Sequence, residues 1–252
     1  MSQDPTHTIM RADYLLAAAL FVSTEETRYY LNGIYTEPHQ AGGAVCVATE
    51  GHGLGCVYDD EGYCHNPQGV WHTSAITALK NLMTAAKKHR PPAGNLYAEL
   101  KHTEATTSVT LWQADCVQSA LKRTLDAHHL GVTTDKTFWV DGTFPEWRRV
   151  TAAFMVHEKD PEPGPALLPA GINARYLKRF GDFAKLISGE AGAPVIPVAI
   201  GPGYRLLIDS HPHAMAITME MRAGLSGSEI EAVPWLIAMD HVPELTVKKK
   251  AA

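Results

Sequence analysis

The sequence predicts an α+β protein in which helices lie on one side of antiparallel sheets. One pattern, a helical segment followed by two or three short strand-like segments, occurs three times along the 252 residues. Two of the helical segments, 75–88 and 172–187, have one apolar face and one charged face. The composition, 45% apolar and 19% charged, is typical of a soluble globular protein and allows a substantial core.

The first repeat follows a lead, residues 1–9, that we expect to be disordered. A short helix is predicted over 10–22, and because it is apolar almost all round it should be well covered. Strands are predicted at 24–33 and 45–54, where side chains alternate with a period of two. The acidic segment 59–62 has the chemistry of a turn.

In the second repeat, Thr73 or Ser74 can cap a helix over 75–88, and Pro91-Pro92 ends it. An extra helix is expected over 115–129, with Val117, Leu121 and Leu125 facing inward. The strands of this repeat are predicted at 96–102, 108–113 and 136–140.

The third repeat follows a linker over 156–169 that contains four prolines. After the helix over 172–187, strands are predicted at 195–200, 204–209 and 214–219. Beyond them, the apolar segment Ile230–Met239 could dock onto its own or a neighbouring chain.

Several segments carry a more specific signal than periodicity. They are Thr-Glu-Glu-Thr-Arg-Tyr-Tyr-Leu-Asn-Gly at 24–33, Val-Cys-Val-Ala-Thr-Glu-Gly-His-Gly-Leu at 45–54, Asp-Gly-Thr-Phe-Pro-Glu-Trp-Arg-Arg-Val at 141–150, Ile-Asn-Ala-Arg-Tyr-Leu at 172–177 and Ile-Thr-Met-Glu-Met-Arg at 217–222. In content and order they resemble motifs of the bacterial DNA polymerase III beta subunit, the sliding clamp. The chain resembles a truncated or divergent member of that family.

The resemblance implies the DNA-clamp (processivity) fold, built from helix-plus-antiparallel-strand units, with about one and a half clamp domains in the chain. Residues 10–150 resemble the middle domain of the family, and 171–222 resemble the end of its last domain. Residues 151–170 form the Pro-rich linker and 223–252 a C-terminal extension.

The resemblance also implies a peptide-binding pocket, in which clamps hold a short linear motif of a polymerase or another partner. An apolar wall with a few polar groups at the rim suits such a ligand. The matching positions are Arg28, Leu31, Thr49, Gly51, His52, Leu54, Pro145, Arg149, Val150, Ile217, Thr218, Met219, Met221 and Arg222. Gly53 stands where the family has arginine, and Glu220 where it has proline. The alternative is that these residues only pack two units together.

Clamp helices face the DNA in the hole of a ring and meet phosphates without reading bases. By the resemblance, the DNA-facing residues are Lys80, Lys87, Lys88, Arg175, Lys178 and Lys185. The alternative is an ordinary solvated helix face. The formal net charge of −5 argues against simple tight DNA binding, but a protein that encircles DNA needs only a local basic lining.

No catalytic residue, metal site or cofactor is predicted. The groups around His65, His128-His129 and His211–His213 lack the paired spacing of a zinc site, and Asp59–Glu61 is explained equally well by a turn or a cation. The four cysteines have no CxxC spacing, which favours reduced thiols in a cytoplasm. Neither a signal peptide nor an apolar run long enough to span a membrane is apparent.

The expected function is therefore that of a non-enzymatic sliding-clamp-like processivity factor. Its expected partners are non-specific, encircled duplex DNA, a DNA polymerase or another protein with a clamp-binding motif, a clamp loader and further copies of the chain. Four chains of three units would supply the twelve units of a clamp ring. Two alternatives are an adaptor or decoy that binds clamp-binding motifs without encircling DNA, and a clamp remnant with neither activity.

Overall fold

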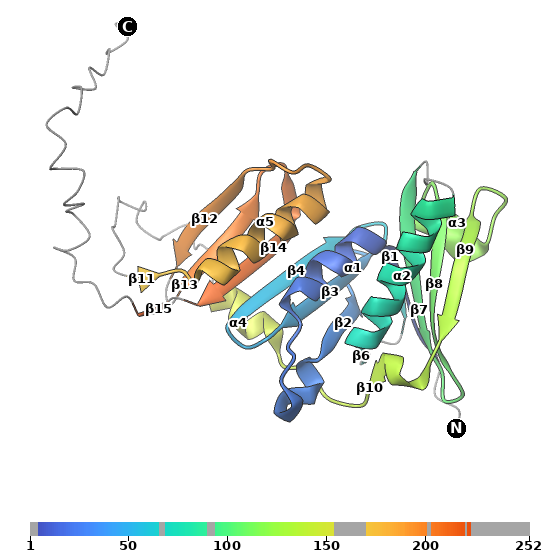
Figure 1. Ribbon diagram of the computed structural model, residues 1–252, viewed down its shortest axis with the longest axis horizontal. Helices are drawn as coiled ribbons and strands as arrows, with labels where there is room; N and C mark the ends of the chain where they lie inside the picture. The colour runs from blue at the N-terminus through green and yellow to red at the C-terminus, as the bar shows by residue number, and fades with distance from the viewer. Residues whose placement is uncertain are drawn as a thin grey trace, which may run out of the picture.

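The structure is a computed structural model that describes residues 5–65, 69–89, 94–153, 170–200, 203–219 and 221–222. Three helices, α1 (Ala12–Ala18), α2 (Thr73–His89) and α5 (Ala174–Ser188), form one layer against two antiparallel sheets (Figure 1). The C-terminal extension expected at 223–252 and most of the linker expected at 151–170 lie outside the described residues; of the linker range, 151–153 belong to α4 (Trp147–Ala153) and 170 begins β11 (Ala170–Gly171).

We divide the chain into three units, numbered in sequence order, each of which contributes one helix to this layer: α1 in unit 1, α2 in unit 2 and α5 in unit 3. Unit 1 comprises β1 (Thr6–Arg11), α1, the 3-10 helices η1 (Ala19–Phe21) and η2 (Glu26–Leu31), β2 (Gly33–Pro38), β3 (Ala44–Thr49), β4 (Gly53–Asp59) and β5 (Tyr63–His65). Unit 2 comprises β6 (Val70–His72), α2, β7 (Asn95–His102), β8 (Thr107–Ala114), α3 (Val117–Lys122), β9 (His128–Thr134), η3 (Lys136–Phe138), β10 (Trp139–Val140) and α4 (Trp147–Ala153). Unit 3 comprises β11 (Ala170–Gly171), α5, β12 (Val195–Ile200), β13 (Gly203–Ile208), β14 (His211–Met219) and β15 (Met221–Arg222).

Units 1 and 2 exchange their first strands. The five-stranded sheet has the order β5-β1-β7-β8-β9, so β1 of unit 1 lies beside β7 of unit 2. The eight-stranded sheet has the order β10-β6-β2-β3-β4-β14-β13-β12, so β6 of unit 2 lies beside β2 of unit 1. Because each unit supplies a strand to the sheet of the other, the two units fold as one body.

Unit 3 joins unit 1 through the backbone of the same sheet. Strand β14 pairs antiparallel with β4, with Ile217 opposite Leu54 and Ala216 opposite Gly55. The strands of units 1 and 3 therefore form one continuous sheet, and α5 lies beside α1 on the same face of it (Figure 1).

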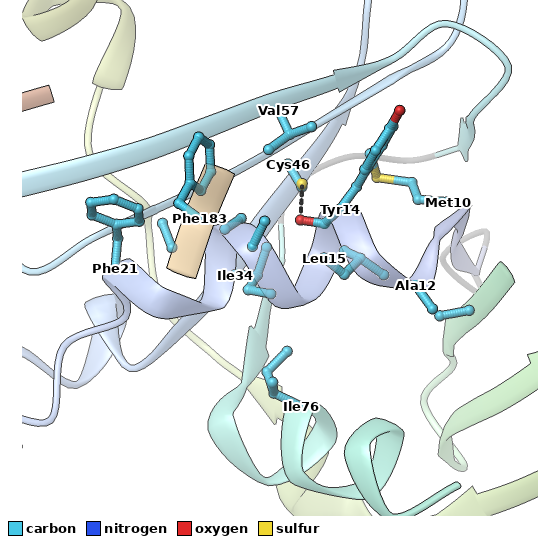
Figure 2. Close-up of a cluster of buried hydrophobic side chains, with 14 of the residues drawn as sticks. Met10, Ala12, Tyr14, Leu15, Phe21, Ile34, Cys46, Val57, Ile76 and Phe183 are labelled. Carbon is cyan, nitrogen blue, oxygen red and sulfur yellow. Dashed lines mark hydrogen bonds between the residues drawn. The ribbon is translucent and has the colours of Figure 1, made fainter. Parts of the chain in front are cut away.

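Phe21 holds the two helices together. Its side chain is fully buried, and its ring centroid lies 6.0 Å from that of Phe180 and 5.6 Å from that of Phe183, both on α5. Figure 2 shows Phe21 and Phe183 near the end of α1. The Phe21 ring packs so closely against β4 that position 55 can hold only a glycine: a Cβ built on Gly55 would lie 2.4 Å from the Phe21 Cδ2 atom. The absence of a side chain at Gly55 thus lets the aromatic cluster reach the sheet.

A polar contact supports this packing at the turn between β3 and β4. The Tyr176 hydroxyl donates to Glu50 Oε1 at 2.6 Å, and the Arg179 guanidinium donates to the same oxygen at 3.1 Å. Arg179 also lies over the Phe21 ring, at 5.5 Å from its centroid. Unit 3 is therefore attached to unit 1 by backbone pairing, aromatic packing and a half-buried ion pair.

Many of the predicted elements are present. The helices over 75–88 and 172–187 correspond to α2 and α5, and the strand at 195–200 is β12. The short apolar helix within 10–22 is α1 followed by η1, and its side chains are mostly buried as expected. Strands predicted at 96–102, 108–113, 204–209 and 214–219 differ from the observed strands by a few residues at their ends.

Two predictions near the N-terminus are wrong. The strand expected over 24–33 is not formed, because β2 begins only at Gly33; most of the segment is η2, which has a kink at Arg28 (φ −113°, ψ 48°). Tyr29 is 54% exposed while Leu31 is buried, so the period-two pattern does not describe which side chains face inward. The expected disordered lead includes β1, which is ordered because its backbone pairs with both β5 and β7.

Two predictions in unit 2 are also wrong. The helix expected over 115–129 ends at Lys122, because Arg123 adopts a left-handed conformation (φ 52°) that terminates it. Leu125, expected to face inward, is 97% exposed. The β-branched run that follows pairs with β8 as β9, and the strand expected at 136–140 is η3 followed by β10.

The close contact of Phe21 with Gly55 predicts opposite effects for two glycine-to-alanine substitutions. Gly55→Ala should lower the free energy of unfolding by about 1–3 kcal/mol, because a fully buried ring cannot move aside. Gly181→Ala, in an exposed part of α5 with no atom within 4 Å of its Cβ, should raise it by about 0.5–1 kcal/mol. Urea unfolding at one fixed protein concentration measures both. Equal stability of the two variants would contradict this packing.

A buried carboxyl at the end of β4 predicts a pH dependence. Burial raises the pKa of Asp59 to about 6, although the Arg11 backbone N–H donates to its Oδ2 at 2.9 Å. Because the folded pKa lies above that of an unfolded aspartate, stability from this group is complete below about pH 4 and is lost as the pH rises through 6. A difference of about two pH units corresponds to roughly 3 kcal/mol.

Asp59→Asn should remove this dependence, because the amide oxygen can still accept from Arg11 and has no proton to lose. The variant should therefore gain stability relative to the native chain between pH 4 and pH 7.5, as measured by urea unfolding across that range. A constant difference between the two proteins over this pH range would show that Asp59 is ionised throughout.

Candidate peptide-binding site

The candidate site lies on the face of the eight-stranded sheet that points away from α1, α2 and α5. Side chains along a strand alternate between the two faces of a sheet. In β3, Cys46 packs in the core under the helices, whereas Val45 and Val47 belong to a second apolar cluster on the opposite face. The second cluster, which we call the outer cluster, consists of Leu31, Val45, Val47, Leu54, Val70, Val140, Phe144 and Ile217.

The outer cluster brings together segments that are far apart in the sequence. Leu31 comes from η2, Leu54 from β4 and Ile217 from β14, and each is 2–3% exposed. Leu54 and Ile217 are direct cross-strand partners in the β4–β14 pair. The structure therefore places three of the predicted site residues together in one apolar cluster.

The turn between β3 and β4 forms one border of the site. The Thr49 hydroxyl donates to the Gly53 carbonyl at 2.8 Å and accepts from the Gly51 N–H at 3.1 Å. Gly51 has a φ of 96°, and a Cβ built on it would meet the Arg28 guanidinium at 2.5 Å. Arg28 itself is held by two 2.7 Å hydrogen bonds to the Glu25 carboxylate. This turn thus places Arg28 over a backbone with no side chain.

The end of β14 continues the same border. The Met219 backbone N–H donates to the His52 carbonyl at 2.9 Å, which fixes Met219 beside the turn. The Met219 side chain is 44% exposed, and His52 is also exposed. A flexible apolar side chain is thus presented to solvent next to an exposed histidine.

Helix α4 forms the other border. Arg148 donates to the Glu37 carboxylate, including a 3.2 Å bond from Nη1 to Oε2, and Glu37 is buried. The ring of Phe144 stacks on that of Tyr35 at 5.0 Å between centroids. These contacts hold the segment while Pro145, Arg149 and Val150 remain exposed, with Val150 at 44%.

Some predicted site residues do not face this surface. Thr218 is fully buried and pairs with Gly53, one residue along from the Leu54–Ile217 pair, so alternation turns it toward the helix face. At Gly53 itself, a Cβ would lie 3.2 Å from Tyr176 and 3.4 Å from Phe21. The glycine in place of the family arginine therefore accommodates the packing of α5. Met221 and Arg222 are placed only by their backbone, in β15.

Sequence reasoning missed several residues of this surface. Tyr29 is 54% exposed and lies beside Gly142, whose Cβ would be 3.3 Å from the Tyr29 ring. Trp147 packs against the outer cluster, and the Arg148–Glu37 pair anchors α4. The available signal was the density of aromatic and arginine residues in the 28–31 and 144–149 segments, which is typical of binding surfaces.

The chemistry of the site suits binding. Its buried base is aliphatic and aromatic, with arginine, threonine and histidine at the border. Within the parts of the chain that the structure describes, no cluster of three or more His, Cys, Asp or Glu side chains could hold a metal ion. Among the described helices, none combines the length and apolar character that a membrane span requires.

The six residues expected to face DNA are all exposed and lie on α2 and α5. Both helices belong to the layer on one side of the sheets (Figure 1). One of the six is partly neutralised, because Lys178 Nζ lies 2.8 Å from Asp182 Oδ2. Helix α1, which lies between them, is largely buried, so the basic residues form two separate stripes.

Comparison with solved structures confirms the expected fold. The DNA polymerase sliding clamp from Pseudomonas aeruginosa has a TM-score of 0.50 at 15% identity, covering 86% of this chain and 66% of that chain. A structure of the DNA polymerase III subunit beta from the same organism gives 0.50 at 16% identity with the same coverage. The DnaN sliding clamp from Bartonella birtlesii bound to griselimycin gives 0.40 at 21% identity, covering 85% and 51%.

The sequence matches no family model and no curated protein. The chain therefore has the fold of the bacterial sliding clamps at low sequence identity. It spans about half to two thirds of the length of the clamps it matches.

Proposed function

We propose that this chain is a clamp-like processivity factor that encircles duplex DNA in the cytoplasm and tethers a polymerase or repair protein through the candidate peptide-binding site. It assembles from several copies, is opened by a clamp loader and catalyses no reaction. The observation that carries the proposal is the convergence of η2, the β3–β4 turn, α4 and the end of β14 around one apolar cluster. The clamp fold of the chain supports it.

Exposed apolar side chains support the use of this surface for binding. Tyr29, Val150 and Met219 are 44–54% exposed and come from three of the converging segments. Large apolar side chains at a surface lose contact with water when a ligand covers them, which is favourable by roughly 25 cal/mol per Å². A short apolar peptide segment would cover side chains of this kind.

The peptide site is tested by the affinity of a fluorescently labelled peptide that carries the clamp-binding segment of a bacterial DNA polymerase. Met219→Glu should weaken binding at least tenfold, because it places a charge against the apolar surface. Leu125→Glu, at a 97% exposed position in the turn after α3, should leave the affinity unchanged. Equal affinities of the two variants in fluorescence anisotropy would show that the peptide binds elsewhere or not at all.

DNA encirclement is tested by salt dependence and topology together. If α2 faces the phosphates, replacing Lys80, Lys87 and Lys88 by alanine should reduce the slope of log K against log salt by about 0.9 for each phosphate that a lysine no longer neutralises. Lys178→Ala should have a smaller effect than Lys185→Ala, because Lys178 is already paired with Asp182. Binding measured on short duplex DNA over a salt series gives these slopes.

Retention on circular DNA separates encirclement from simple surface binding. A closed ring should remain on nicked circular DNA at high salt, where phosphate contacts are screened, and leave when the DNA is cut. A chain that binds the peptide but is never retained on circular DNA would instead be an adaptor or decoy for clamp-binding motifs. The overall charge of −5 and the two separate basic stripes are compatible with that second function.

A further inference from the structure

Each of the three units contains the same two-stranded ribbon. In each unit, the first strand, which precedes the helix, pairs antiparallel with the last strand of the unit. In unit 1 the ribbon is β1 with β5, in unit 2 it is β6 with β10, and in unit 3 it is β11 with β15. Between its two ribbon strands, each unit has a helix followed by three sheet strands, so the units are structural repeats.

In units 1 and 2 the ribbons are exchanged. The ribbon of unit 1 adds to β7, the first sheet strand after α2, through six residue pairs. The ribbon of unit 2 adds to β2, the first sheet strand after α1, through three residue pairs. Each unit therefore has two complementary parts: a ribbon that pairs with the neighbouring unit, and a sheet edge that pairs with the ribbon of that neighbour.

Within the described residues, unit 3 uses neither part. Its ribbon β11–β15 forms a separate two-stranded sheet, and its first sheet strand after the helix, β12, pairs only with β13. Both parts lie at the end of the molecule opposite β9 (Figure 1). An unpaired strand edge presents a row of backbone donors and acceptors that favours a partner strand.

We propose that a second copy of this chain completes unit 3. The ribbon of each copy adds to the β12 edge of the other, so that two copies of unit 3 repeat the arrangement of units 1 and 2. A unit that carries both a ribbon and an edge is complementary to itself under a two-fold rotation. A foreign strand would fill only the β12 edge and leave the ribbon unpaired, which favours the second copy as the occupant.

The side chains next to this edge suit such an interface. On α5, Arg179 lies toward α1, since its guanidinium covers Phe21. Leu177 is two positions earlier, about 200° away around the helix, and is 54% exposed. Gly181, one turn further on the side of Leu177, has open space beside it, because a Cβ built on it would meet no atom within 4 Å. Ile196 on β12 is 46% exposed on the other face of the sheet, because its neighbour Val195 is the one that packs into the core under the helices. Each side of the β12 edge thus has an exposed apolar side chain that a second copy can cover.

Pro197 limits how far the pairing can extend. Proline has no backbone donor and is found in sheets mainly on edge strands. Long pairing along β12 is therefore disfavoured, which also protects the edge from uncontrolled association. A short ribbon such as β11, which pairs with β15 over two residues, needs only a short stretch of edge.

The test measures the mass of the full chain by sedimentation across a concentration series. All variants carry Val132→Lys, which places a charge on the exposed side of β9 and prevents association between copies at that other edge. This protein should have twice the 27.4 kDa mass of one chain. Adding Ile196→Lys or Leu177→Lys should return it to the mass of one chain.

A monomeric Val132→Lys protein, or a dimer that persists with both Ile196→Lys and Leu177→Lys, would overturn the proposal. Circular dichroism checks that each variant is folded. Amide hydrogen exchange on the Val132→Lys protein gives a second readout, because the amides of 195–200 should become more protected as the concentration rises. Unchanged protection of this strand would also overturn the proposal.

This junction extends the proposed function but does not depend on it, since it needs neither DNA nor a peptide. Peptide affinity measured on the same variants tests the candidate site on the other side of unit 3. Loss of the dimer with normal peptide binding, and the reverse, are therefore separate results.

Discussion

The pairing of β14 with β4 is the interaction on which the rest of the structure depends. It joins unit 3 to unit 1 through one continuous sheet, and the sheet can accept α5 beside α1 only because Gly55 leaves space for Phe21. Packing in protein interiors is dense, so this fit fixes the position of α5 within narrow limits. The two faces of the joined sheet then have different roles.

The helix face carries the core and the exposed basic residues of α2 and α5, while the outer face carries the apolar cluster. Leu54 and Ile217 belong to the same outer face because they are cross-strand partners, although more than 160 positions separate them in the sequence. The candidate site is therefore a consequence of strand register: a slip of one residue would turn Ile217 toward the helices and Thr218 outward.

Local patterns were sufficient to predict the amphipathic helices α2 and α5, since the 3.6-residue period is present in their own residues. They failed for 24–33, where the buried face of η2 is decided by the outer cluster, and for 115–129, where Arg123 ends α3 and the next segment pairs with β8. The motif resemblance located the site segments but not their orientation, as Thr218 shows. Strand exchange depends on long-range pairing and left no local signal.

The central claim is that β4 is an interior strand because β14 covers its edge. Amide hydrogen exchange on the assigned full-length chain tests it most directly. If the pairing is present, the amides of 53–57 that point toward β14 exchange as slowly as those of the central strand β3. If they exchange as fast as the amides on the outer edge of β9, unit 3 is not attached to unit 1 in this way and the candidate site is not assembled.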